Sequence, residues 1–394
     1  MSIKPITKIK ILDLTRYLPG GYATQVFADL GAEVIKIEEM KKGDFCRGDE
    51  PKINGVSYYF SALCRNKKSL TVNLKDSSGK RIFKLLAKKA DIIVENFRPG
   101  VTKRLGIDYA EIKKINPKII YCSLSAFGQS NPASLKATHD LNLQALSGYL
   151  SLNGGKPSPI HLADVATAMV SAIGISIALF YREVTGKGQY VDVGMFDSFS
   201  WWLSLLYSRF HFQGNKISPE TIEYPALCYN TYATKDNKLM AFGMVEPKFW
   251  KEFCEKTGME ELIPKQFLRR HEAPEEWEKL SALVASKTQK EWLEWLKGKD
   301  ICIAPVKNVA EAVKDMMEDD TGIVDYVNFP VVGSILQTAL PLKMSEVPVS
   351  FQSATPPPAL GENTAEILEK IGFSKEDIKD LAEQGVISLY KELD

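Results

Sequence analysis

The first 130 residues alternate between short apolar segments and segments with helical periodicity, and this alternation constrains the fold more than any other feature. We expect strands at 8–15, 32–38, 69–74, 91–97 and 119–127, with helices between them, such as one from about Asp76 to Lys89. Strands connected in this way through helices run parallel, with helices on both faces of the sheet. The sequence therefore predicts an α/β protein with a mostly parallel sheet.

Four loops are expected at the carboxyl ends of these strands, where open parallel sheets bind their ligands. They are rich in Gly, Pro and Arg, as an anion-binding rim would be, and comprise Arg16–Gly21, Glu38–Gly43, Asn96–Gly100 and Ser125–Gly128. A dinucleotide site is not expected. Only the pair Gly20-Gly21 follows the first strand, and the Gly-x-Gly-x-x-Gly fingerprint is absent.

A second, smaller domain is expected after an aromatic-rich crossing segment. A hairpin is predicted from Tyr229–Thr234 and Lys238–Gly243, and helices follow to about Lys297. Two further helices, 363–371 and 374–383, close the chain. The expected organisation is a large domain over 1–200, a linker over 201–226, a small domain over 227–325, and a return linker with the rest of the large domain over 326–394.

The charge balance and the cysteine pattern exclude several function classes. Fifty Lys and Arg against 49 Asp and Glu give a net charge of +1, so no global field favours nucleic acid or an anionic membrane. The run Val165–Tyr181, about 17 residues without a charge, is short for a bilayer and is expected to be a core helix. Six cysteines without a CxxC and four histidines without HxxxH or HExxH spacing predict reduced thiols, a cytoplasmic protein and no metal site.

Candidate acid/base groups lie on three separate segments. His139 and Asp164 are about 25 residues apart, and Glu246 could orient the imidazole. An imidazole and a carboxylate on opposite walls of one cavity could remove a proton from one face of a carbon and return it to the other. Asp140, Asp164 and Glu246 each also stand where an acidic residue is an ordinary helix cap, so both interpretations remain open.

A basic cluster could supply phosphate contacts. It runs from Arg65 through Asn66 and Lys67 to Lys68 and, together with Arg98, could hold phosphates because Arg offers a bidentate fork and Lys a point charge. A solvated basic turn is the alternative.

Several motifs together resemble the family III coenzyme A transferases and the α-methylacyl-CoA racemases. They are Asp13-Leu14, Ala28–Lys36, Arg65–Ser69, Glu95–Gly100, Ser125–Gln129, Thr185–Gln189 and Leu360–Thr364. The resemblance implies a Rossmann-like large domain made from both chain ends and a smaller inserted α+β domain. It also implies a homodimer of interlocked chains, with an active site between the large domain of one subunit and the small domain of the other.

The resemblance extends to the candidate catalytic residues. Asp164 matches the nucleophile of the transferases, and Thr138–Leu143 resembles the histidine segment of the racemases. Glu246-Pro247-Lys248-Phe249 matches their Glu-Pro-x-Phe segment. Two features depart from the racemase pattern: Val165–Ala168 replaces a run of glycines, and Gln144–Gly148 is closer to the transferase branch.

The resemblance thus implies racemisation of 2-methyl-branched or other 2-substituted acyl-CoA thioesters. The catalytic residues of this reaction would be His139, Asp164, Glu246 and Asp140. Coenzyme A is part of the substrate, and no other cofactor is expected. The residues that bind coenzyme A would be Arg16, Arg65, Asn66, Lys67, Lys68, Asn96, Arg98 and Gly128. The alternatives are CoA transfer between carboxylic acids through Asp164, and an acyl-CoA-binding dimer without turnover.

Overall fold

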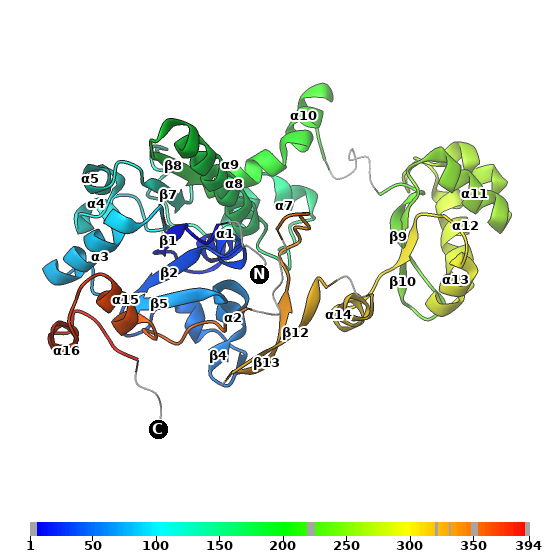
Figure 1. Ribbon diagram of the computed structural model, residues 1–394. Coiled ribbons are helices and arrows are strands. Elements are labelled where there is room, and N and C mark those ends of the chain that lie inside the picture. Colours follow the sequence, from blue (N-terminus) through cyan, green and yellow to red (C-terminus); the bar gives the residue numbers. More distant parts are fainter. Residues whose placement is uncertain (1–5, 219–224, 320–321, 331, 348–353, 391–394) are drawn as a thin grey trace. The chain divides into compact units, whose positions relative to one another are not determined.

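The chain divides into two compact units in the computed structural model (Figure 1). The structure describes residues 6–218, 225–319, 322–330, 332–347 and 354–390. The first unit comprises Met1–Arg209 and Asp320–Asp394, and the second comprises Phe210–Asp319. The first unit is therefore drawn from both ends of the chain, and the second is an insertion within it.

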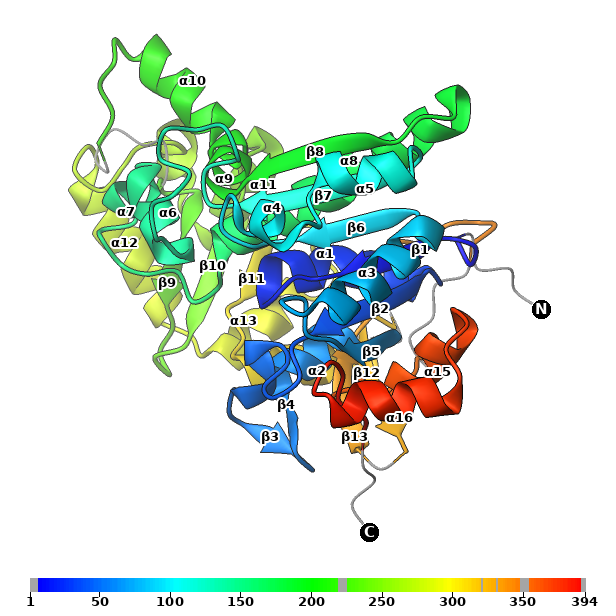
Figure 2. The same ribbon diagram turned by 90° about the vertical axis from the view of Figure 1, so that its left-hand side faces the viewer.

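A six-stranded parallel sheet forms the centre of the first unit, which confirms the predicted fold class. Its order is β5-β2-β1-β6-β7-β8, and Figure 2 shows this order from β8 at the top to β5 at the bottom. The strands are β1 (Lys10–Asp13), β2 (Glu33–Glu38), β5 (Lys67–Thr71), β6 (Ile92–Glu95), β7 (Ile120–Ser125) and β8 (Gln189–Gly194). Strands β2 and β5, which follow β1 in the sequence, lie on one side of β1, and the later strands β6, β7 and β8 lie on its other side. The strand order therefore reverses at β1.

Successive strand residues bury their side chains on opposite faces of this sheet. Ile11 packs into one core with α1 and α8, whereas its neighbour Leu12 packs into the other core with α3, α5, α15 and α16. Figure 1 shows α3 and α5 on one side of the sheet and α1 and α8 on the other. Burial of each such side chain contributes about 1.5–3 kcal/mol. The helices are α1 (Leu18–Asp29), α3 (Ser77–Lys89), α4 (Val101–Leu105), α5 (Tyr109–Ile115), α8 (Leu162–Thr185), α15 (Thr364–Lys370) and α16 (Lys375–Glu383).

Helix α8 is buried on one side only. Ala166, Ile175 and Ala178 are buried, but its opposite side exposes large apolar residues, including Ile177 at 61% and Phe180 at 73%. By length and composition alone, α8 is the one helix in the described part of the chain that could also cross a membrane. The expected core helix is therefore present, with an uncovered apolar side that the sequence did not predict.

Several elements of the first unit were not expected from sequence. Helix α9 (Met195–Trp202) extends into the start of the segment that we expected to be a linker, and α10 (Ser204–Phe212) lies within that segment and ends in the second unit. Three further elements precede or follow the predicted strands: the short hairpin of β3 (Lys52–Ile53) and β4 (Val56–Ser57), helix α2 (Tyr58–Cys64), and the antiparallel pair β12 (Val324–Phe329) and β13 (Gly333–Thr338). Their strands are short or polar, so they lack a strong apolar pattern.

The second unit contains the predicted hairpin, β9 (Tyr229–Ala233) and β10 (Leu239–Gly243), with β11 (Ile303–Pro305) antiparallel to β10. Its core includes the buried aromatic residues Trp250, Phe253 and Trp292. The helices of this unit are α11 (Pro247–Thr257), α12 (Pro274–Ala285), α13 (Gln289–Leu296) and α14 (Val309–Glu318), with 3-10 turns at Glu260–Lys265 here and at Phe45–Gly48 in the first unit.

A buried network of charges joins the central strands to α1. Lys67 Nζ lies 3.1 Å from Asp13 Oδ2, and both side chains are fully buried. Asp13 also accepts hydrogen bonds from the hydroxyls of Thr15 and Thr24. Burial alone would raise the pKa of Asp13, but the positive charges of Lys36 and Lys67 and these hydrogen bonds hold it well below its ordinary value.

Removal of the Asp13 carboxylate should therefore strongly destabilise the fold. In Asp13→Ala, Lys67 keeps its buried charge without its anionic partner, and we expect the free energy of unfolding in urea to fall by about 3–5 kcal/mol. Glu255→Ala, which removes an exposed pair with Lys251, is the matched control and should leave the midpoint unchanged within error. Equal effects of the two variants would contradict this role for the buried pair.

Candidate functional site

A cavity of about 650 Å³ lies at the carboxyl ends of β1, β2, β5 and β6. The loops that follow these strands line it with four basic side chains, Arg16, Lys41, Lys42 and Lys75, and with three acidic ones, Glu38, Glu39 and Asp44. The carboxylates of Glu38 and Asp44 are paired with Arg47 and Lys36, which leaves the unpaired charge mainly positive. Three of the contributing loops are ones that the sequence predicted, and 72–75 is an addition. A basic cavity at the point where strand order reverses is suited to an anionic ligand such as a nucleotide.

Hydrogen bonds from neighbouring loops fix the walls of this cavity. The Asn96 side chain accepts from the backbone N–H of Arg16 (3.0 Å) and donates to its carbonyl (2.8 Å). Asp44 accepts from the backbone N–H of Tyr17 (3.1 Å) and pairs with the buried Lys36 (2.7 Å). Asn96 therefore acts here by holding the Arg16 loop, and its amide is already used for that purpose.

The predicted phosphate-binding cluster after α2 is instead committed to contacts within the chain. Arg65 pairs with Asp29 and donates to Gln337, and Lys67 pairs with Asp13. The Asn66 amide donates to Asp29, and Lys68 pairs with both Glu33 and Glu366. These four residues precede or begin β5, whereas the cavity follows the strand ends. We therefore do not retain Arg65, Asn66, Lys67 and Lys68 as phosphate ligands.

Two other predicted ligands occupy different positions. Arg98 is exposed and donates to the carbonyl of Leu135 (2.5 Å). Gly128 is buried at φ +76°, with Asp192 3.4 Å from where a Cβ would stand, so its glycine is required by a turn. Arg98 remains a candidate ligand, and Gly128 has a structural explanation.

The first turns of α6 (Asp140–Leu146) and α8 are joined by one carboxylate. Asp140 Oδ1 accepts hydrogen bonds from the backbone N–H groups of Ala163 (2.7 Å) and Asp164 (3.2 Å). Its Oδ2 accepts from the Gln144 side chain (2.5 Å). Asp140 thus caps a helix, which is one of the two interpretations that the sequence left open for it. The capped helix is α8 rather than its own. This bond brings two of the predicted catalytic segments together.

Asp164 has the protonation behaviour of a functional carboxyl group. Burial first, and then the neighbouring Asp140 carboxylate, raise its pKa to about 7, while the charge of His161 opposes this shift. One side-chain oxygen or nitrogen atom from each of Asp140, His161 and Asp164 lies within 4.8 Å of the corresponding atoms of the other two residues. Near neutral pH this carboxyl group can therefore act as an acid or as a base.

His139 lies directly before α6. Its N–H donates to the Asn142 side chain (3.1 Å), and its carbonyl accepts from the N–H groups of Asn142 and Leu143, so its backbone starts the helix. Its imidazole is exposed. Since the next residue bonds to the start of α8, His139 and Asp164 stand at two adjoining helix N-termini.

Glu246 belongs to the second unit. It is exposed, and its carbonyl accepts from the N–H groups of Phe249 and Trp250 at the start of α11. Pro247 follows as the first helical residue. The structure therefore leaves the Glu246 carboxylate accessible at a helix start.

Aromatic side chains connect the cavity to Asp164. The guanidinium of Arg16 lies 4.3 Å from the ring centroid of Phe45, and the Phe45 ring contacts Tyr17 at 6.1 Å. Tyr17 in turn contacts Tyr59 at 5.8 Å. Burial, and next the charge of Asp164, raise the pKa of Tyr59. Tyr17 adopts φ 60°, a conformation that non-glycine residues rarely show outside constrained or functional sites.

Sequence reasoning missed His161, Tyr59, Lys41, Lys42 and Lys75 as site residues. Lys41 and Lys42 were inside a predicted strand-end loop, and Lys75 follows a predicted strand. Because open parallel sheets bind ligands beyond the carboxyl ends of their strands, these positions could have identified them. Tyr59 and His161 carried no motif. Their roles depend on the packing of α2 and α8, which the sequence pattern did not give.

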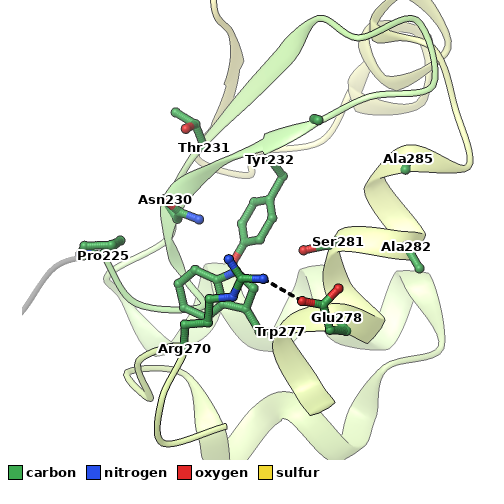
Figure 3. Close-up of a pocket in the computed structure, with 11 residues that line it drawn as sticks. Pro225, Asn230, Thr231, Tyr232, Arg270, Trp277, Glu278, Ser281, Ala282 and Ala285 are labelled. Carbon is green, nitrogen blue, oxygen red and sulfur yellow. Dashed lines mark hydrogen bonds and ion pairs between the residues drawn. The ribbon is translucent and has the colours of Figure 1, made fainter. Parts of the chain in front are cut away.

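A second cavity, of about 630 Å³, lies in the second unit beside β9 and α12 (Figure 3). Arg270 and Glu278 pair with each other across it at 2.8 Å. Tyr232 and Trp277 form much of the remaining wall. Because its charges are paired, this cavity is less suited to an anion than the cavity of the first unit.

Replacement of Asp164 by Asn should stabilise the fold at high pH. Between the ordinary value near 3.8 and the folded value near 7, the folded chain binds more protons than the unfolded chain, so stability falls as pH rises. Asn does not titrate. We expect Asp164→Asn to raise the free energy of unfolding by about 1–3 kcal/mol at pH 8, and to have little effect at pH 3. Urea unfolding at several pH values measures this, and a pH-independent difference would contradict it.

Comparison with known proteins places these features in a family. The model of CoA-transferase family III matches residues 6–364. The chain is 33% identical to succinyl-CoA:glutarate CoA-transferase of Mus musculus over 99% of this chain and 92% of that protein. It is also 33% identical to α-methylacyl-CoA racemase of Homo sapiens over 97% of each chain.

Solved structures agree with the sequence comparison. A CAIB/BAIF family protein from Brucella suis superposes with a TM-score of 0.83 at 25% identity, covering 94% of this chain and 100% of that one. This agreement, the family match over nearly the whole chain and the curated relatives confirm the resemblance found in the sequence: the chain belongs to CoA-transferase family III.

Proposed function

We propose that the protein racemises 2-methyl-branched or other 2-substituted acyl-CoA thioesters by two-base proton transfer at the α-carbon. The observation that carries this proposal is the Asp140 bond, which sets His139 and Asp164 at adjoining helix starts. Coenzyme A is part of the substrate, and the proposal includes no further cofactor.

In the proposed reaction, His139 removes the α-proton from one enantiomer, and protonated Asp164 delivers a proton to the opposite face. A thioester acidifies its α-carbon, and the intermediate carries negative charge on the thioester oxygen. The backbone N–H of Asp140 in the first turn of α6 would stabilise that oxygen. A pKa of about 7 suits Asp164 to both directions, because its acid and its base form coexist near neutral pH.

The substrate would be held mainly at its nucleotide end. We assign that end to the basic cavity with Arg16, Lys42 and Lys75, which supply charge for phosphates. The pantetheine arm would then follow Phe45, Tyr17 and Tyr59 toward Asp164. Binding energy from the nucleotide end and the pantetheine arm can position the reacting carbon without direct contact to it.

CoA transfer is the second candidate function. Asp164 would attack an acyl-CoA to form a mixed anhydride and release CoA thiolate, which attacks the aspartyl carbonyl to give an aspartyl-CoA thioester and free the donor acid. The acceptor carboxylate would then attack this thioester to form a second anhydride, and the released thiolate would take its acyl group and free Asp164. The relatives that carry transferase names and the Val165–Ala168 segment, which replaces the glycines of racemases, favour this alternative. A non-catalytic acyl-CoA-binding protein is the third alternative.

A deuterium experiment distinguishes the three functions. A single 2-methylacyl-CoA enantiomer is incubated with the protein in deuterated water, with and without a second free carboxylic acid. Racemisation predicts α-deuterium and loss of optical purity without the acid, as measured by mass spectrometry and chiral chromatography. A new thioester that forms only with the acid would contradict racemisation and support transfer. Absence of both products would support binding alone.

The variant His139→Ala is the test of the second base. We expect it to lower the rate of α-deuterium incorporation by at least about 100-fold, because general-base contributions are typically of this size. Leu141→Ala, on the same helix, is a matched control for local packing, since Leu141 is partly exposed. Full exchange by His139→Ala would remove His139 from the mechanism.

We further propose that two copies of the chain associate as interlocked subunits, so that Glu246 of one subunit orients His139 of the other. The uncovered apolar side of α8 supports association, since Ile173, Ile177 and Phe180 are all at least half exposed. Trp201 of α9 and Leu205 of α10 expose further apolar surface at 63% and 82%. Apolar surface of this extent is more common at interfaces than on monomers. Cys46, Cys64, Cys122 and Cys254 are buried thiols, which supports the cytoplasmic location that we propose.

Mixed subunits test whether the site is shared. Asp164→Asn and Glu246→Gln should each be inactive alone. When the two chains are co-expressed with different tags, half of the dimers should be mixed, and each mixed dimer should contain one intact site. We therefore expect about a quarter of the wild-type activity to return. No recovery in purified mixed dimers would show that both residues act within one chain, and full activity of Glu246→Gln would remove Glu246 from the site.

A further inference from the structure

One titratable side chain beside Asp164 has no role in the proposed reaction. His161 is the residue before the first turn of α8, and its Nδ1 lies 3.7 Å from Asp140 Oδ2. Its side chain is 57% exposed, whereas that of Asp140 is 8% exposed. His161 therefore stands between solvent and a pair of largely buried carboxylates.

The position of His161 is unusual for a histidine that carries charge. A cation at a helix N-terminus is disfavoured by the helix dipole. Two carboxylates within 4.8 Å reverse this preference, because they attract an imidazolium and repel each other. The charges of Asp140 and His161 therefore act on the ionisation of Asp164 in opposite directions.

We propose that His161 is a positioning residue that controls the charge of Asp164 by sharing one proton with it. When Asp164 ionises, its proton leaves to solvent and a proton binds the exposed imidazole, so that the imidazolium lies beside the Asp140 and Asp164 carboxylates. When the imidazole loses its proton, the two carboxylates repel each other and Asp164 is protonated again. This inference deepens the proposed function, since either racemisation or transfer requires Asp164 in a defined protonation state.

The groups that face Asp164 come from three elements and have different effects. Asp140 of α6 favours the neutral acid, and His161 beside α8 favours the carboxylate. Tyr59 of α2 is a neutral phenol near this group, because burial and, next, the charge of Asp164 raise its pKa. His161 is thus the one group among these that can supply positive charge.

The test measures the charge of Asp164 directly. The full chain is labelled with ¹³C at aspartate side-chain carboxyl carbons, and Asp164→Asn identifies the Asp164 signal. We expect His161→Ala to raise the titration midpoint of Asp164 on the order of one pH unit, and His161→Lys to bring it back toward or below the wild-type value. The acid limb of the pH profile for α-deuterium exchange should shift in the same direction.

His139→Ala is the matched control, because His139 is not among the groups that shift the pKa of Asp164. Its Asp164 midpoint should equal that of wild type. An unchanged midpoint in a folded His161→Ala variant, or the same shift in His161→Ala and His161→Lys, would overturn the proposal. The titration needs no turnover, so a failure of the proposed function would appear as absent exchange with the His161 effect still present.

Discussion

The hydrogen bonds from Asp140 to the start of α8 are the constraint on which the site depends. One carboxylate caps a helix formed by residues more than 20 positions later, and so joins two segments that carry the chemistry. The same carboxylate lies close enough to Asp164 to oppose its ionisation. A structural cap thereby adds to burial in opposing the ionisation of Asp164.

A second constraint acts beneath the cavity. Buried pairs between Lys36 and Asp44 and between Lys67 and Asp13 hold the central strands, α1 and the loop after β2 in one arrangement. Such pairs contribute little net stability compared with apolar replacements, but removal of one partner is costly. They help to place Tyr17 and the Arg16 loop at the strand ends, so the geometry of the cavity depends on buried charges.

The sheet, its parallel order and most of its helices could be predicted from sequence, because apolar periodicity and caps such as Asp76 are local signals. The position of the cavity could be predicted as well, since three of its loops follow from the position of strand ends alone. The pairing of the predicted phosphate cluster at Arg65–Lys68 could not be predicted: Asp29, Asp13, Glu33 and Glu366 neutralise it from elements far away in sequence. The role of His161 was missed for the same reason, because it depends on which carboxylates the fold brings beside α8.

In the proposed complex, one acyl-CoA extends from the basic cavity to a carbon between His139 and Asp164. A crystal structure with a thioether analogue of a 2-methylacyl-CoA would show whether it does. We expect phosphates beside Lys42 and Lys75, and the α-carbon within about 3–4 Å of the Asp164 carboxylate on one face and of the His139 imidazole on the other. An α-carbon that contacts Asp164 alone, with His139 turned into a separate space, would contradict it.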